Sequence, residues 1–202
     1  MELNESTKLA KARENIIQKA KQHALFKNVE KTKGHIVFGR GEDSAKIIFM
    51  GEAPGFSENE KGKPFVGRSG ALLELWVKHI GLGEKDYAVI NSVPIIPLDE
   101  EGKIRPPAPE EINYFFDATK KIIDEINPEI LVLLGKSAAR AFNLEDMRVG
   151  EVREHIGKKF MFIYHPAYYL RNGKKGLEDA EKIKTAIEKH AGQKKQLNLR
   201  NF

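Results

Sequence analysis

The 202-residue sequence contains no cysteine. Without thiols the chain can form neither disulfides nor thiolate zinc sites, and it cannot ligate an iron–sulfur cluster through cysteine. It also has no apolar run approaching the roughly 18 residues of a membrane-spanning helix. Its first residues, MELNESTKLAKAREN, lack the apolar core of a secretory signal. We therefore expect a cytoplasmic protein with no metal, no cofactor and no membrane partner.

Positive charge is in modest excess, because 34 Lys and Arg residues outnumber 29 Asp and Glu residues for a net charge of +5. Such a balance permits a nucleic-acid partner without requiring one. The composition, 41% hydrophobic and 31% charged, is typical of a globular protein, and 202 residues lie within the size range of one α/β domain. We expect one domain over residues 1–202 and a monomer, with a helical extension over 1–35 and a flexible tail over 192–202.

Short apolar runs bounded by turn residues alternate with helical patterns. The runs predict buried strands at Lys46–Met50, Tyr87–Ile90, Ile130–Leu134 and Phe160–Tyr164. Apolar residues at helical spacing predict helices over residues 5–22, Ser69–Ile80, Pro109–Ile126, Lys136–Phe142 and Leu177–His190, with Ser69 as an N-cap. Strands that alternate with helices form parallel sheets with right-handed crossovers. The expected fold class is α/β, a three-layer α/β/α domain around a central four-stranded, mainly parallel sheet.

Chemically distinct groups follow the expected strands. They are Glu52 after the first, Asn91 after the second, Lys136 and Ser137 after the third, and His165 after the fourth. In open parallel sheets the ligand crevice lies beyond the carboxyl ends of the strands. Each residue alone has an ordinary explanation, as a turn cap or a satisfied core histidine. Together, a carboxylate, an amide and an imidazole at one edge favour a pocket that reads the polar edge of a heterocycle.

Five segments carry a family resemblance in their order and spacing. They are GEAPGFSENEKGKPFVGRSGALLELW, INSVP, RPPAPEEI, PEILVLLGKSAARAF and YHPAYYLR. From about Val37 to Arg171 the chain closely resembles the family 4 branch of the uracil-DNA glycosylase superfamily. The resemblance implies a DNA repair enzyme that flips uracil out of single- or double-stranded DNA and hydrolyses its N-glycosidic bond, leaving an abasic site.

The resemblance implies two catalytic residues. Glu52 orients or activates the attacking water and stabilises the positive charge that develops on the sugar. His165 donates to O2 of uracil and stabilises the departing uracil anion. A neutral imidazole suits that role, so His165 needs no raised pKa.

The resemblance also implies the residues that bind the base. Phe65 stacks on the flipped base, and Asn91 donates to O4 and accepts from N3–H, a pattern that cytosine does not offer. Glu58 borders the C5 edge and obstructs the methyl group of thymine. The backbone around Ala53 and Gly55 approaches the flipped nucleotide closely.

A third group of residues is expected at the DNA itself. Phosphates of the DNA are expected at two helix starts, with Ser69, Lys136 and Ser137, and at Arg171. The gap that the flipped base leaves in the duplex is expected to be filled by Tyr169 or Leu170. Tyr169 departs from the family, which has an apolar residue there. The alternative is that Tyr169 and Leu170 are ordinary packing residues and that the basic residues belong to a solvated loop.

The missing cysteines are the chief departure from family 4, whose members usually hold a four-cysteine iron–sulfur cluster. A rough alignment places two of those positions near Ile95 and Phe115, where apolar packing is the expected replacement. Two alternatives to uracil excision stay open. One is a glycosylase for hypoxanthine or another deaminated base, and the other is a non-catalytic module that binds uracil or DNA.

Overall fold

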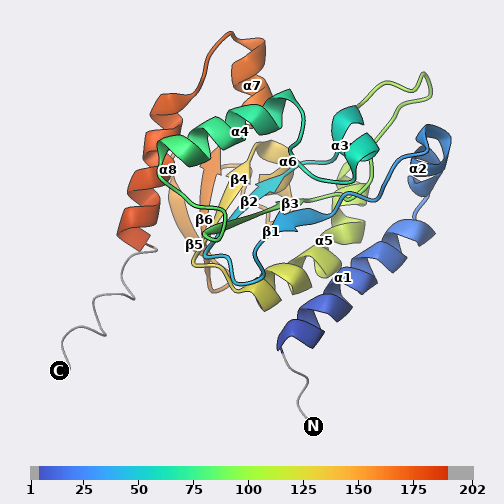
Figure 1. Ribbon diagram of the computed structural model, residues 1–202, viewed down its shortest axis with the longest axis horizontal. Coiled ribbons are helices and arrows are strands. Elements are labelled where there is room, and N and C mark those ends of the chain that lie inside the picture. The colour runs from blue at the N-terminus through green and yellow to red at the C-terminus, as the bar shows by residue number, and fades with distance from the viewer. Residues whose placement is uncertain (1–4, 191–202) are drawn as a thin grey trace.

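The computed structural model describes residues 5–190 and builds them around one six-stranded sheet, with strand order β1-β3-β2-β4-β6-β5 (Figure 1). The four central strands are parallel: β3 (Tyr87–Asn91), β2 (Ile47–Gly51), β4 (Ile130–Leu134) and β6 (Lys158–Ile163). The edge strands β1 (Gly39–Gly41) and β5 (Val152–His155) run antiparallel to their neighbours. The predicted four-stranded parallel sheet is thus confirmed, and it is two strands wider than expected.

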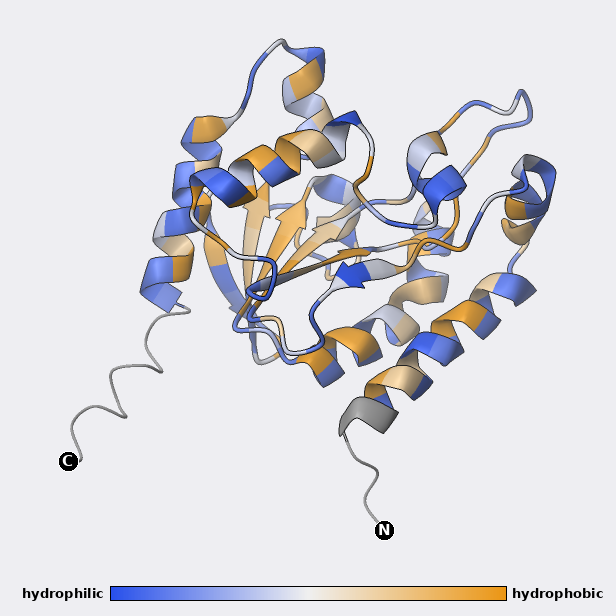
Figure 2. Cartoon of the chain, viewed as in Figure 1, coloured by the Kyte–Doolittle hydropathy of each residue, from blue (hydrophilic) through white to orange (hydrophobic). Residues whose placement is uncertain are grey.

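Helices cover both faces of the sheet, which confirms the α/β/α layers (Figure 1). One face carries α1 (Glu5–Gln22), α5 (Pro109–Ile126) and α6 (Lys136–Arg140), and the other carries α4 (Arg68–His79), α7 (Pro166–Arg171) and α8 (Leu177–His190). Figure 2 shows the central strands β2, β3 and β4 as mostly hydrophobic, as expected for strands buried on both sides, whereas the edge strand β1 is polar. Within residues 5–190, no helix combines the length and apolar character needed to cross a membrane.

The predicted bounds of α1, α5 and α8 match the structure, and α6 ends two residues before the expected end at Phe142. The helix of the N-terminal extension packs along α5 and buries Ile16 and Ala20 completely, so it contributes to the core. Three short helices, α2 (Phe26–Thr32), α3 (Phe56–Lys61) and α7, were not expected. The flexible tail predicted over 192–202 lies outside the described residues.

Helix α4 begins one residue earlier than predicted, at Arg68, and its N-cap is Gly67 rather than Ser69. Near this start the helix approaches the preceding loop closely. A Cβ on Gly70 would lie 1.9 Å from the backbone oxygen of Phe65. Only glycine therefore lets the first turn of α4 lie against the backbone that carries Phe65.

We predict that Gly70→Ala destabilises the protein, although alanine is normally more stable than glycine in the interior of a helix. The added methyl group collides with backbone, so the free energy of unfolding should fall by about 1–3 kcal/mol. Thermal or urea unfolding followed by circular dichroism measures the change. Lys78→Ala, at an exposed position of the same helix, is the control. An unchanged or higher unfolding midpoint for Gly70→Ala contradicts the close approach.

Candidate active site

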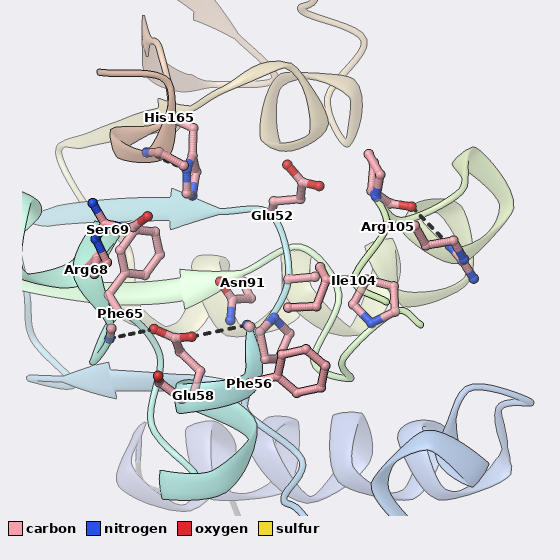
Figure 3. Close-up of a pocket in the computed structure, with 18 of the residues that line it drawn as sticks. Glu52, Phe56, Glu58, Phe65, Arg68, Ser69, Asn91, Ile104, Arg105 and His165 are labelled. Carbon is pink, nitrogen blue, oxygen red and sulfur yellow. Dashed lines mark hydrogen bonds between the residues drawn. The ribbon is translucent and has the colours of Figure 1, made fainter. Parts of the chain in front are cut away.

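A cleft of about 590 Å³ lies at the carboxyl ends of the central strands (Figure 3). The structure brings most of the predicted site residues together in its lining, which includes Glu52, Ala53, Gly55, Glu58, Phe65, Ser69, Asn91, His165 and Arg171. Lys136, Ser137, Tyr169 and Leu170 are not part of this lining. The convergence of residues from four separate segments follows from the parallel sheet, which sets the ends of its strands side by side.

The floor of the cleft is built where β2 and β3 end in register, with Gly51 paired to Asn91. A Cβ on Gly51 would lie 2.5 Å from the ring of Phe65 and 3.0 Å from Oδ1 of Asn91. Glycine at this position thus lets the ring and the amide lie next to each other at the sheet edge. Asn91 is 1% exposed, and its Nδ2 is a buried donor without a hydrogen-bond partner among the described residues. A buried donor of this kind is costly unless a ligand accepts from it.

Phe65 forms one wall of the cleft and is held in an unusual backbone conformation. Its φ of 54° lies in the left-handed region, which a bulky residue rarely adopts. The side chain is 7% exposed, and the ring centroid lies 5.6 Å from that of His165. Residues held in such strained conformations concentrate at functional sites. The flat ring beside the unpaired amide is suited to stack on a planar base.

Glu58, on α3, fastens two loops of the cleft together. Its carboxylate accepts backbone N–H groups from Gly55 at 3.2 Å, Val66 at 3.0 Å and Gly67 at 2.8 Å. These bonds join the turn after β2 to the turn before α4, so Glu58 shapes the cleft as well as lining it (Figure 3). Its predicted role at the C5 edge of a base stays a prediction.

Glu52 follows β2 directly and is partly buried within the cleft. Burial raises the pKa of its carboxyl group, because the ionised form loses contact with water. The Ser137 side chain and the positive charge of Arg171 partly oppose that rise in pKa. Ser137 thus acts on the ionisation of Glu52, and its predicted contact with a phosphate stays a prediction.

His165 caps the N-terminus of α7, where its Nδ1 accepts the backbone N–H of Ala167 at 3.2 Å. An accepting Nδ1 leaves the proton of the neutral imidazole on Nε2, which is then a donor. Burial lowers the pKa of His165 to about 4, and the charge of Arg171 adds to the effect. At neutral pH the cleft therefore contains an uncharged histidine that donates one hydrogen bond.

Neither Tyr169 nor Leu170, the residues predicted to fill the gap in the DNA, lines the cleft. Tyr169 is 4% exposed, packs edge-on against Trp76 at 5.3 Å and donates its hydroxyl to Asp179. It is a packing residue in this structure, which agrees with the alternative stated from the sequence. Leu170 is half-buried and lines a second cavity of about 280 Å³ with Arg68, Ser69, Ala167 and Arg171. Lys136 is exposed at the start of α6.

Several lining residues were missed by the sequence analysis, namely Phe56, Arg68, Ile104 and Arg105. Arg68 stands beside Ser69 at the start of α4, and its position could have been inferred from that neighbour. Phe56 opens a helix too short to show a period, and Ile104 lies in a polar hairpin. Neither of those two segments carries a pattern that predicts a cleft residue.

The residues present do not fit an iron–sulfur cluster. The chain has no cysteine, and the two aligned positions, Ile95 and Phe115, are completely buried in the apolar core. The ring of His23 packs 5.2 Å from that of Phe115. Among residues 5–190, no group of three or more histidine, aspartate or glutamate side chains is arranged to hold a metal ion. Apolar and aromatic side chains surround both positions.

Comparison with known proteins agrees with this geometry. Residues 38–189 match the model of the uracil DNA glycosylase superfamily. The type-4 uracil-DNA glycosylase of Archaeoglobus fulgidus is 36% identical over 155 residues, which cover 71% of this chain and 76% of that protein. The type-4 enzymes of Thermotoga maritima and Saccharolobus solfataricus are 34% and 33% identical, covering 77% and 85% of this chain and 84% and 83% of theirs. The chain therefore belongs to the uracil-DNA glycosylase superfamily.

Proposed function

We propose that this protein excises uracil from DNA by hydrolysing the N-glycosidic bond and leaves an abasic site. The observation that carries the proposal is the meeting of Glu52, Asn91 and His165 in one cleft, with the amide donor of Asn91 buried and unpaired. A flipped uracil supplies the partner that this donor lacks. The type-4 uracil-DNA glycosylases among its relatives support the same substrate.

The base enters the cleft edge first in the proposed complex. Asn91 donates from Nδ2 to O4 and accepts at Oδ1 from N3–H, whereas cytosine offers a donor and an acceptor in the reverse order. Phe65 stacks on one face of the ring, and Nε2–H of His165 donates to O2. The cost of extruding the nucleotide, a few kcal/mol, is offset by these contacts and by those to the DNA strand.

The proposed reaction is a displacement at C1′ of the sugar. The C1′–N1 bond breaks, and its electron pair leaves on uracil, where the charge spreads onto O2. A water molecule held by Glu52 forms the new C1′–O bond, and its proton passes to the carboxylate and then to solvent. The uracil anion later takes a proton from solvent. His165 stabilises the anion as a neutral donor, which its low pKa supports, and the step uses only side chains of this chain and water.

The burial of Glu52 argues against a module that only binds uracil or DNA. Keeping a carboxylate in a desolvated cleft costs free energy that binding alone does not require. A raised pKa in a cleft is instead typical of catalytic acids and bases. Arg68 and Arg171 line the same cleft and are exposed, so they are available to the phosphates of the strand.

We predict that Glu52→Gln slows excision without weakening DNA binding. The amide keeps the shape of the side chain but accepts no proton from water, so the single-turnover rate should fall on the order of 10²- to 10⁴-fold. A uracil-containing oligonucleotide, cleaved afterwards at abasic sites, reports the rate, and fluorescence anisotropy reports the affinity. Glu60→Gln, exposed on α3, is the matched control. A wild-type rate in Glu52→Gln refutes the role of Glu52.

We predict that Asn91→Asp relaxes the choice between uracil and cytosine. A carboxyl group buried at this position is held in its neutral form, which can donate to N3 of cytosine and accept from its amino group. The ratio of single-turnover rates on uracil and cytosine should fall about ten- to hundredfold, as uracil loses its matched partner. Paired oligonucleotides that differ only in that base measure the ratio. If the ratio of the two rates is unchanged, Asn91 does not distinguish uracil from cytosine.

We predict that Arg171→Gln raises the pKa of both Glu52 and His165, because the charge of Arg171 lowers both in the native protein. The excision rate depends on ionised Glu52. The acidic limb of the pH–rate profile, measured at saturating DNA, should therefore move to higher pH. NMR titration should place the pKa of His165 near 4 in the wild type and above that value in the variant. Lys174→Gln removes an equal charge from a neighbouring exposed residue and should leave both unchanged. An acidic limb that stays in place or moves to lower pH contradicts the coupling.

A further inference from the structure

Two of the exposed large apolar residues stand in the cleft. Among the residues that the structure describes, the exposed large hydrophobic side chains are Phe56, Leu75, Ile104, Ile156, Tyr164 and Tyr168. Phe56 is 51% exposed and Ile104 is 47% exposed, and both line the cleft together with Asn91 and His165. The other four do not line it. Phe56 and Ile104 therefore face whatever occupies the cleft, whereas the tyrosines lie outside it.

The mouth of the cleft differs in chemistry from one side to the other. Arg68 and Ser69 lie on one side in Figure 3, and Ile104 lies on the opposite side with Phe56 near it. Arg105 adjoins Ile104, but its guanidinium donates to both carboxylate oxygens of Glu111, at 2.9 and 2.5 Å. Its charge is thus taken up by an ion pair. One rim offers the guanidinium of Arg68 and the hydroxyl of Ser69, and the opposite rim offers the apolar side chains of Ile104 and Phe56.

The apolar rim is held in place by its own contacts. Ile104 pairs with Leu98 across the hairpin, and the backbone N–H of Arg105 donates to the carbonyl of Pro97 at 3.1 Å. Phe56 is the first residue of α3, where Glu58 fixes the preceding Gly55. A Cβ on Gly55 would lie 3.9 Å from Cδ1 of Ile104, so the two segments approach each other there. Phe56 and Ile104 are therefore exposed side chains on segments that these backbone contacts hold in place.

We propose that Phe56 and Ile104 form an apolar seat for the deoxyribose of the flipped nucleotide, and that this seat selects DNA over RNA. The inference rests on the proposed function. The base readers lie deepest, since Asn91 is 1% exposed, so the sugar of a bound nucleotide lies at the mouth. Its phosphates meet the rim of Arg68 and Ser69, which turns the remaining part of the sugar toward the apolar rim.

The 2′ position is where the two sugars differ. Deoxyribose presents a methylene group there, and ribose presents a hydroxyl that donates and accepts hydrogen bonds. Neither Phe56 nor Ile104 has a polar side-chain atom, so a ribose hydroxyl pressed against them loses water and gains no partner. The seat also keeps bulk water away from C1′, which leaves the water held by Glu52 as the nucleophile.

Two inhibitors test the seat. They are single-stranded oligonucleotides with one uridine that carries either 2′-fluorine or 2′-hydroxyl, because both electronegative groups slow cleavage at C1′. Each is titrated against excision of a deoxyuridine oligonucleotide by the wild-type protein. The fluorinated strand should inhibit about tenfold more strongly, the cost of an unpaired hydroxyl. Equal inhibition by the two strands, or inhibition by neither while excision proceeds, overturns the proposal.

Two variants test whether the preference for the fluorinated strand arises at Ile104. Ile104→Thr supplies a hydroxyl beside the 2′ position and should bring the two inhibition constants close to each other. Leu75→Ala, at an exposed apolar position of α4 outside the cleft, should keep the wild-type difference. Unfolding midpoints confirm that the variants are folded. If Ile104→Thr keeps the wild-type preference, the seat is not at Ile104 and the proposal fails.

A last comparison separates the seat from a role in filling the gap in the duplex. Contact with the sugar is common to all substrates, so Phe56→Ala and Ile104→Ala should slow excision by the same factor in single and double strands. A loss confined to double-stranded DNA would mean that the pair replaces the flipped base in the stack, and would overturn the seat. Wild-type excision of uracil tests the proposed function separately, since it does not depend on any variant.

Discussion

The site depends on one register, the pairing of Gly51 with Asn91 at the ends of β2 and β3. Side chains alternate between the faces of a strand, so a slip of one residue would turn the amide of Asn91 away from the cleft. The absence of a side chain at Gly51 is equally necessary, because a Cβ there would occupy the place of the Phe65 ring. Backbone pairing and one glycine thus fix the amide and the aromatic wall before any loop contributes.

The loops that complete the cleft are tied to each other rather than to the sheet. Glu58 bonds three backbone N–H groups across two turns, and Gly70 lets α4 lie against the backbone of Phe65. The left-handed conformation of Phe65 is held between these contacts. Such a fixed enclosure is what desolvates Glu52 and His165, so the perturbed pKa values of the site are a consequence of how its walls are fastened.

The core of this arrangement could be predicted from the sequence. Uninterrupted apolar runs located the four parallel strands, and their parallel order placed Glu52, Asn91 and His165 at one edge. The edge strands were missed because Gly39–Gly41 and Val152–His155 are short, partly exposed and without an apolar run. Tyr168 and Tyr169 are adjacent in a helix of six residues, and only the packing of Trp76 and Asp179 decides that Tyr169 is the buried one.

Burial shifts the pKa values of the two candidate catalytic groups in opposite directions, and this supports the roles proposed for them. It raises the pKa of Glu52 and lowers that of His165 to about 4. Arg171 lowers both pKa values, which keeps the carboxylate ionised and the imidazole neutral at the same pH. A site built in this way accepts a proton from water at Glu52 while His165 stays a hydrogen-bond donor, so the proposed hydrolysis needs no proton from the histidine.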